Sequence, residues 1–139
     1  MHLILLWLAS LAWATGVAAE DVEPRTVSLE LNTIDTDQGG CRLTFVANTT
    51  FEGGIDAAVL EAVLIDTAGT VQLLTLFDFG SLPMGRPRVR QFVVPGQGCD
   101  PVGRVLINGF GTCDGPGLTP SVCAGGLRLS SRVDVELIG

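Results

Sequence analysis

Apolar and polar residues alternate along much of the chain after residue 24. The period is two, which is typical of a β-strand with one face on a core and the other in water. Segments 27–31 and 127–137 show the pattern most clearly, since every second position in each is apolar or a serine. Both ends of the chain after residue 24 are therefore predicted to be strands.

Five further segments have the length and composition of strands, namely 41–48, 55–66, 71–79, 86–96 and 103–110. Glycine, proline and aspartate are frequent between them, and these residues are typical of tight turns. No amphipathic helix is sustained anywhere after residue 24. Seven short strands with such turns predict an antiparallel β-sandwich, in which two sheets pack their apolar faces together.

Segment 55–66 is ambiguous. Its alanine, leucine and glutamate residues favour a helix, and Asp56 is a suitable N-cap. However, the segment is apolar on almost all sides and leads into Asp66-Thr-Ala-Gly69, a tight-turn sequence, before a second apolar run. We therefore predict that it is a central strand and the first arm of a hairpin.

Segment 86–96 contains the only basic cluster of the chain. Arg86, Arg88 and Arg90 fall on one face of a strand, and without a break the next apolar side chains would share that face. A bulge near Arg90 and Gln91 would restore an apolar side, so the sequence predicts one there.

The N-terminal segment resembles a secretory signal peptide. An apolar stretch over 3–13 precedes small residues, and Val17-Ala18-Ala19 suits a cut between Ala19 and Glu20. We expect residues 1–19 to be removed and residues 20–139 to form one domain in the periplasm or outside the cell, with no stable membrane insertion. Because the first residues lack lysine and arginine, an uncleaved anchor is the alternative.

Export determines how the cysteines are interpreted. Cys41, Cys99, Cys113 and Cys123 form an even set, and in an oxidising compartment two disulfides are expected. If chain direction alternates from strand to strand, Cys41 and Cys99 lie at one end of the sandwich and the other two lie at the opposite end. Because a disulfide needs Cα atoms within about 7 Å, we predict the pairs Cys41–Cys99 and Cys113–Cys123.

Composition excludes several functions. The net charge is −7 and the eight cations are all arginines, which argues against nucleic acids and anionic membranes as partners. The one histidine, His2, lies in the predicted signal peptide, and the chain has no lysine or tyrosine. Histidine-dependent triads and lysine Schiff bases are therefore absent, so we predict a protein that is not an enzyme and has no cofactor.

Two segments are candidate contacts with a partner protein. The loop between Cys113 and Cys123 is stiffened by prolines, and Leu118 is expected to be raised at its tip. The alternative is a plain stapled connection between two strands. Arg86, Arg88 and Arg90 would form a stripe that binds carboxylates or phosphates, or would protect a solvated edge strand from pairing.

A different candidate is the acidic turn that contains Asp35 and Asp37. Alternating oxygen ligands suit calcium, although Gly39 and Val46 stand where an EF-hand loop requires ligands. A small-ligand or calcium site at Asp35 and Asp37 is thus the alternative function, and a plain hairpin connection is the alternative structure.

Segments 41–50, 55–69 and 71–96 resemble the small immunoglobulin-like modules of bacterial envelope proteins, the FxLYD-type domains among them. The matching residues are Asn48, Asp66, Gly69, Pro83 and Gly85. The Phe-x-Leu-Tyr-Asp signature is missing, and the cysteines are not part of that pattern. The resemblance implies an immunoglobulin-like fold in the cell envelope and assigns no site residues. Together with the candidate contacts, it leads us to expect a non-catalytic protein that binds another envelope or extracellular protein.

Overall fold

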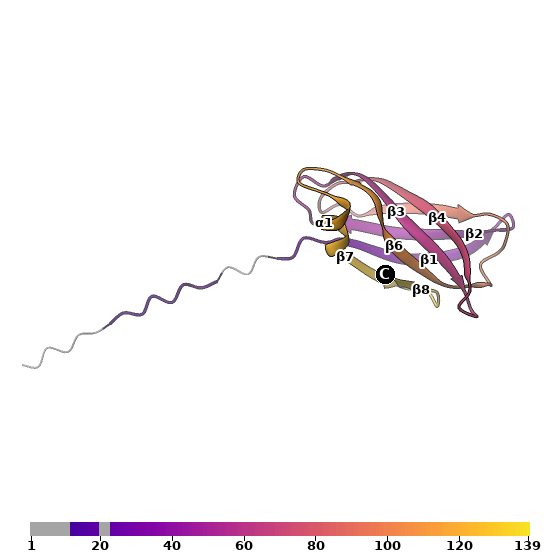
Figure 1. Cartoon of the computed structure of the whole chain (residues 1–139), viewed down its shortest axis with the longest axis horizontal. Helices are drawn as coiled ribbons and strands as arrows, with labels where there is room; N and C mark the ends of the chain where they lie inside the picture. Colours follow the sequence, from indigo (N-terminus) through magenta and orange to yellow (C-terminus); the bar gives the residue numbers. More distant parts are fainter. Residues whose placement is uncertain (1–11, 20–22) are drawn as a thin grey trace, which may run out of the picture.

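The computed structural model describes residues 12–19 and 23–139. In that part of the chain, two sheets of four strands stack face to face, with one short helix at one end (Figure 1). This confirms the predicted all-β sandwich. Most of the predicted signal peptide, and Glu20 at its cleavage site, lie outside the described residues.

Each sheet is built from strands that are distant in the sequence. Sheet A has the order β5-β2-β1-β7, and sheet B has the order β4-β3-β6-β8. The strands of sheet A are β1 (Val27–Asp37), β2 (Gly40–Thr49), β5 (Arg88–Val94) and β7 (Leu127–Ser131). Those of sheet B are β3 (Ile55–Asp66), β4 (Val71–Leu82), β6 (Val102–Asp114) and β8 (Glu136–Ile138).

The connections between strands differ between the first and second halves of the chain. The first four strands form two antiparallel hairpins, β1–β2 in sheet A and β3–β4 in sheet B. From β5 onward every connection crosses to the other sheet. As a result β7 joins β1 and β8 joins β6 in parallel, two pairings that the alternating pattern did not predict.

Strand β3 is the centre of sheet B, as predicted. It pairs antiparallel with β4 on one side and β6 on the other, and Leu60, Ala62 and Leu64 on its inner face are buried. The β3–β4 turn closes where expected. Asp66 Oδ1 accepts hydrogen bonds from the backbone N–H groups of Ala68 (2.9 Å) and Thr70 (2.8 Å), and Gly69 has a positive φ of 87°.

The predicted single strand 127–137 is instead two strands in different sheets, β7 and β8. The chain turns between them because Ser131 Oγ donates to the carbonyl oxygens of Val133 (3.1 Å) and Val135 (2.6 Å). The alternation of apolar residues persists across the break, since the inner faces of both sheets line one core. The pattern therefore identified burial correctly but did not reveal the crossing.

The predicted bulge in β5 is wrong. Strand β5 pairs with β2 without any shift in register, from Cys41 opposite Val94 to Ala47 opposite Arg88. Arg88 and Arg90 therefore share the inner face of β5 with Phe92 and Val94. Phe92 stacks on Phe77 of β4 at 4.3 Å between ring centroids, so this face closes the sandwich against sheet B.

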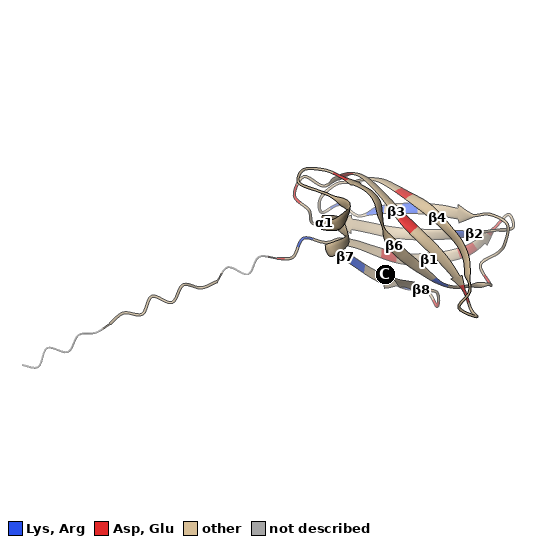
Figure 2. Cartoon of the chain, in the orientation of Figure 1, with Lys and Arg blue, Asp and Glu red and all other residues tan. Residues whose placement is uncertain are grey.

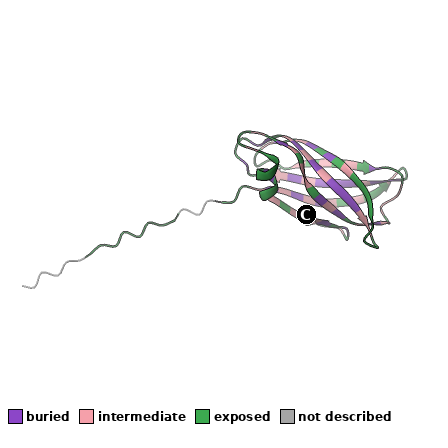
Figure 3. Cartoon of the chain, in the orientation of Figure 1, coloured by how far each residue is buried: buried purple, intermediate pink, exposed green. Residues whose placement is uncertain are grey.

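The core lies between the two sheets. Figure 3 shows buried positions along the strands and exposed positions on the helix. Four phenylalanines of the core contact one another, and their rings meet in edge-on, tilted and stacked pairs: Phe45, Phe77, Phe79 and Phe92.

Both predicted disulfides are confirmed. Cys41 is bonded to Cys99 with 4.7 Å between Cα atoms, and Cys113 to Cys123 with 6.5 Å. The first lies beside the β1–β2 turn and the second joins β6 to the helix, at the opposite end of the sandwich (Figure 1).

Candidate binding surface

The helix α1 (Pro120–Gly125) begins in the loop between Cys113 and Cys123 and includes Cys123. Thr119 caps it, because its side-chain oxygen accepts a hydrogen bond from the N–H of Val122 at 3.2 Å. Pro120 follows in the first turn, where its missing N–H costs nothing. This helix was not predicted from the sequence, although Thr119-Pro120 is a recognisable start signal. Cys123 is fully buried and attaches the helix to the core.

Leu118 does not lie raised at the tip of the loop, contrary to the expectation. Its N–H donates to the carbonyl oxygen of Gly115 at 3.1 Å, and its side chain packs half-buried against the core. Leu118 instead forms a wall of a groove with Phe51 and Val122. We call this cavity of about 480 Å³ the α1 groove.

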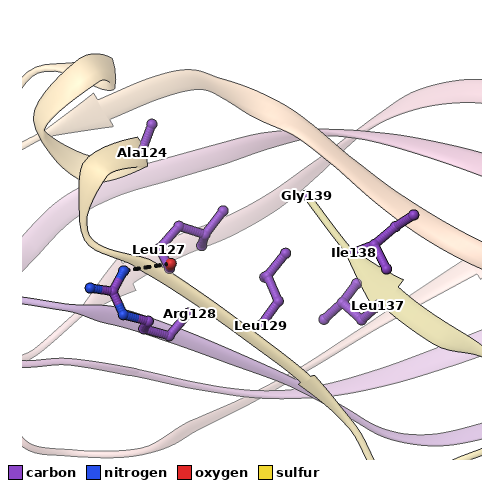
Figure 4. Close-up of a pocket in the computed structure, with 7 residues that line it drawn as sticks. All are labelled: Ala124, Leu127, Arg128, Leu129, Leu137, Ile138 and Gly139. Atoms are coloured by element: carbon purple, nitrogen blue, oxygen red, sulfur yellow. Dashed lines mark hydrogen bonds between the residues drawn. The ribbon is translucent and has the colours of Figure 1, made fainter.

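A second groove of about 420 Å³ lies beside the first. Its lining is largely apolar and comes from β7, β8 and the end of α1: Ala124, Leu127, Leu129, Leu137 and Ile138 (Figure 4). We call it the β7–β8 groove. Its lining comes from both sheets, because β7 belongs to sheet A and β8 to sheet B.

Arg128 lines both grooves. Its Nη1 donates to the carbonyl oxygens of Leu127 at 2.9 Å and Gly125 at 3.4 Å, which holds the side chain at the α1–β7 junction. Arg25 also lines the α1 groove, together with Glu23. Among the described residues, neither arginine forms an ion pair with a carboxylate. Figure 2 shows basic positions on β7 and on the segment that enters β1.

The three arginines of segment 86–96 are not brought together as a free stripe. Arg90 Nε donates to the carbonyl oxygen of Phe79 at 2.7 Å, and Nη2 to that of Ser81 at 3.2 Å. Arg88 donates to the carbonyl oxygen of Pro87, and Arg86 is exposed in the turn before β5. Arg90 thus connects edge strand β5 of sheet A to edge strand β4 of sheet B and stabilises the fold.

The acidic turn between β1 and β2 already holds a cation. Arg42 Nη2 lies 3.1 Å from Asp35 Oδ1 and 3.2 Å from Asp37 Oδ2. The guanidinium therefore takes the position between the carboxylates that calcium would need. Among the described residues, no group of three or more His, Cys, Asp or Glu side chains is arranged to hold a metal ion. Nor does any helix in that part of the chain have the length and apolar character needed to cross a membrane.

Comparisons with known proteins support the fold alone. No known protein family matches the chain, and no curated protein matches it at a significant level. A solved structure of IrmA from Escherichia coli is similar, with a TM-score of 0.59 over 76% of this chain and 91% of that chain, at 14% sequence identity. The likeness agrees with the sandwich described above. It does not bear on the resemblance to FxLYD-type modules, which stays a prediction.

Proposed function

We propose that this chain is an exported, non-catalytic protein that binds another protein of the cell envelope or the extracellular space. The contact surface is the end of the sandwich that carries α1. The observation behind the proposal is that two grooves, each lined by both apolar and polar groups, meet there at Arg128. The Arg86, Arg88 and Arg90 stripe has no part in it, because Arg90 is committed to β4.

The geometry of this end favours a protein partner over a small molecule. Both grooves are open along the surface, whereas small-molecule sites enclose most of their ligand. Arginine is enriched at protein interfaces, and Arg25 and Arg128 line the α1 groove without an ion-pair partner among the described residues. Exposed Val122 and half-buried Leu118 add apolar surface beside them. The Cys113–Cys123 disulfide and the Thr119 cap hold the surface in place, so little conformational entropy is lost on binding.

Export is part of the same proposal. All four cysteines are paired in two disulfides, which persist in the periplasm or outside the cell and are rare in reducing compartments. The envelope setting implied by the resemblance to FxLYD-type modules agrees with this location.

Site-directed photocrosslinking in the host tests the proposal. A photoreactive residue at position 122 should capture a partner, and Arg128→Glu should reduce that capture at least tenfold. The same photoreactive residue at position 89 is the matched control, because Val89 is exposed to a similar degree (58%, against 44% for Val122) but lies on β5, away from the grooves. Equal capture from both positions, or capture that survives Arg128→Glu, would refute the α1 end as the contact surface.

A further inference from the structure

Strand β4 is the least protected edge of the sandwich. Each sheet has two edge strands, β5 and β7 in sheet A and β4 and β8 in sheet B. Three are guarded in the usual ways, since β7 and β8 are short and β5 carries arginines. Strand β4 has 12 residues, and its stretch 71–77 (VQLLTLF) contains no charged side chain. A long, uncharged edge of this kind is a template for pairing with another strand.

Side chains from other parts of the chain contact the outer edge of β4 only toward its ends. Arg90 caps the carbonyl oxygens of Phe79 and Ser81, and Gln97 reaches the side chain of Gln72 at 2.9 Å. Between these points, over residues 73–77, the described residues offer the backbone no hydrogen bond except the ladder with β3. Every second residue in this stretch therefore directs its N–H and C=O groups outward, and these groups have no pairing partner among the described residues.

Apolar side chains border this open stretch. Leu74 is 56% exposed and Leu76 is 59% exposed. They lie on the outer face of sheet B, where Leu74 is the cross-strand neighbour of Val63 and Val63 that of Leu106. The result is an apolar row that runs from the edge into the sheet, which is the kind of exposed patch that marks an interaction site.

Two carboxylates border the same leucines. Glu61 lies directly across from Leu76 on β3, and Asp78 follows Leu76 on the same face of β4. Figure 2 shows acidic positions on both strands. Neither carboxylate is ion-paired within the part of the chain that the structure describes. Each accepts one hydrogen bond, Glu61 from the side-chain amide of Asn108 and Asp78 from the N–H of Gly80. Arg104, the cation on this face, lies on β6 opposite Ile65, two strands in from the edge.

We propose that residues 73–77 of β4 accept an extended segment of another protein as an added strand. The segment would place apolar side chains on Leu74 and Leu76 and a lysine or arginine beside Glu61 and Asp78. Strand addition takes affinity from main-chain hydrogen bonds and specificity from alternate side chains. A second copy of this chain is the less suitable occupant, because each copy carries a net charge of −7 and would bring its own Glu61 and Asp78 to the contact. This site is separate from the grooves at α1 and does not depend on them.

A peptide titration followed by NMR of the ¹⁵N-labelled domain tests this. The probe is a peptide of alternating valine and threonine between terminal lysines, compared with the same peptide between terminal glutamates. The lysine peptide should shift the amide signals of residues 73–77 and bind at least tenfold more tightly than the glutamate peptide. Leu76→Lys should abolish the shifts. Val89→Lys is the matched control and should leave them intact, because Val89 is equally exposed at 58% but lies on β5.

Three results would overturn the proposal. Shifts confined to β5, β7 or β8 would place the strand at another edge. Equal affinity for the two peptides would remove the role of the carboxylates. A dimer in sedimentation that Leu76→Lys converts to a monomer would make a second copy the occupant. Arg128→Glu, which should weaken partner capture at α1, should leave the peptide titration unchanged, so the two proposals fail separately.

Discussion

At the scale of single residues, Arg90 on β5 stabilises the fold, although the sequence indicated that it lies on an exposed surface. A run of three arginines at period two is typical of a solvated face. The aliphatic part of an arginine can nevertheless lie along apolar side chains while its charged end reaches polar atoms. Arg90 points toward β4 beside Phe92, and its guanidinium satisfies two carbonyl oxygens that no strand pairs. An arginine in solvent and an arginine bonded to the backbone of β4 have the same sequence pattern. The position of β4 distinguishes them, and the sequence does not give that position.

Arg90→Ala should therefore lower the free energy of unfolding by about 2 kcal/mol, since it removes charge-assisted hydrogen bonds to the carbonyl oxygens of Phe79 and Ser81. Urea unfolding of the oxidised protein measures the change. Arg86→Ala is the control and should stay within about 0.5 kcal/mol, because Arg86 is exposed in a turn. Equal effects of the two substitutions would mean that Arg90 does not join the sheets.

Asp66 supplies a pH-dependent contribution at the β3–β4 turn. The hydrogen bond from the backbone N–H of Thr70 is the main cause that lowers the pKa of Asp66 below its ordinary value; partial desolvation opposes it, and Ala68 and Gln72 add further hydrogen bonds. A lowered folded-state pKa stabilises the protein above the unfolded-state pKa of about 3.9, and this stabilisation is lost as the pH falls through the folded-state value.

We therefore expect Asp66→Asn to be less stable than the parent near neutral pH, with a gap that closes on acidification. Thermal unfolding in steps from about pH 6 to about pH 2 follows the gap across the titration of Asp66. Asp56→Asn, at an exposed position on β3, should show no such closing gap. A gap between Asp66→Asn and the parent that stays constant with pH would contradict the role of the Asp66 carboxylate.

At the scale of elements, the sequence predicted what depends on local patterns. Segment 55–66 is a strand in the middle of a sheet, between β4 and β6. Its inner face is buried and most of its outer face is half-buried, which agrees with its largely apolar sequence. The division of 127–137 into β7 and β8 was not visible, because alternation reports which side chains face the core and not which sheet carries them. The short helix α1 was not predicted, because six residues form too few turns to show helical periodicity. The grooves at α1 are formed by this helix and by the passage of the chain from β7 to β8, neither of which was predicted. Of the residues that line them, only Leu118 was therefore a candidate from the sequence.

At the β1–β2 turn, two carboxylates already share one cation. Because Arg42 bridges Asp35 and Asp37, millimolar calcium should change the Tm by less than about 1 °C. Scanning calorimetry in calcium chloride and in sodium chloride of equal ionic strength measures this. A rise in Tm with calcium alone would restore the calcium-binding alternative for Asp35 and Asp37.

At the scale of the whole molecule, the two disulfides secure the places where the chain passes between the sheets. Cys99 lies in the connection from β5 to β6, and its bond to Cys41 ties that connection back to sheet A. Cys123 lies in α1, between β6 and β7, and its bond to Cys113 ties α1 to sheet B. These are the two longest connections between the sheets. The Cys113–Cys123 bond therefore holds the α1 end in place, and the Cys41–Cys99 bond does the same at the opposite end of the sandwich. Cys41, Cys113 and Cys123 are also buried in the core.

Removing each disulfide in turn separates these effects. In the loop-entropy description, Cys41→Ala with Cys99→Ala opens a loop of 58 residues and should cost about 4 kcal/mol, and Cys113→Ala with Cys123→Ala opens one of 10 residues and should cost about 3 kcal/mol. Urea unfolding gives both values.

Hydrogen exchange should rise in α1 for the second variant alone, because Cys123 attaches the helix to the core. If the grooves at α1 need this attachment, partner capture from position 122 should fall in the second variant and persist in the first. Equal loss in both variants would mean that global stability, and not the fixed α1 end, determines binding.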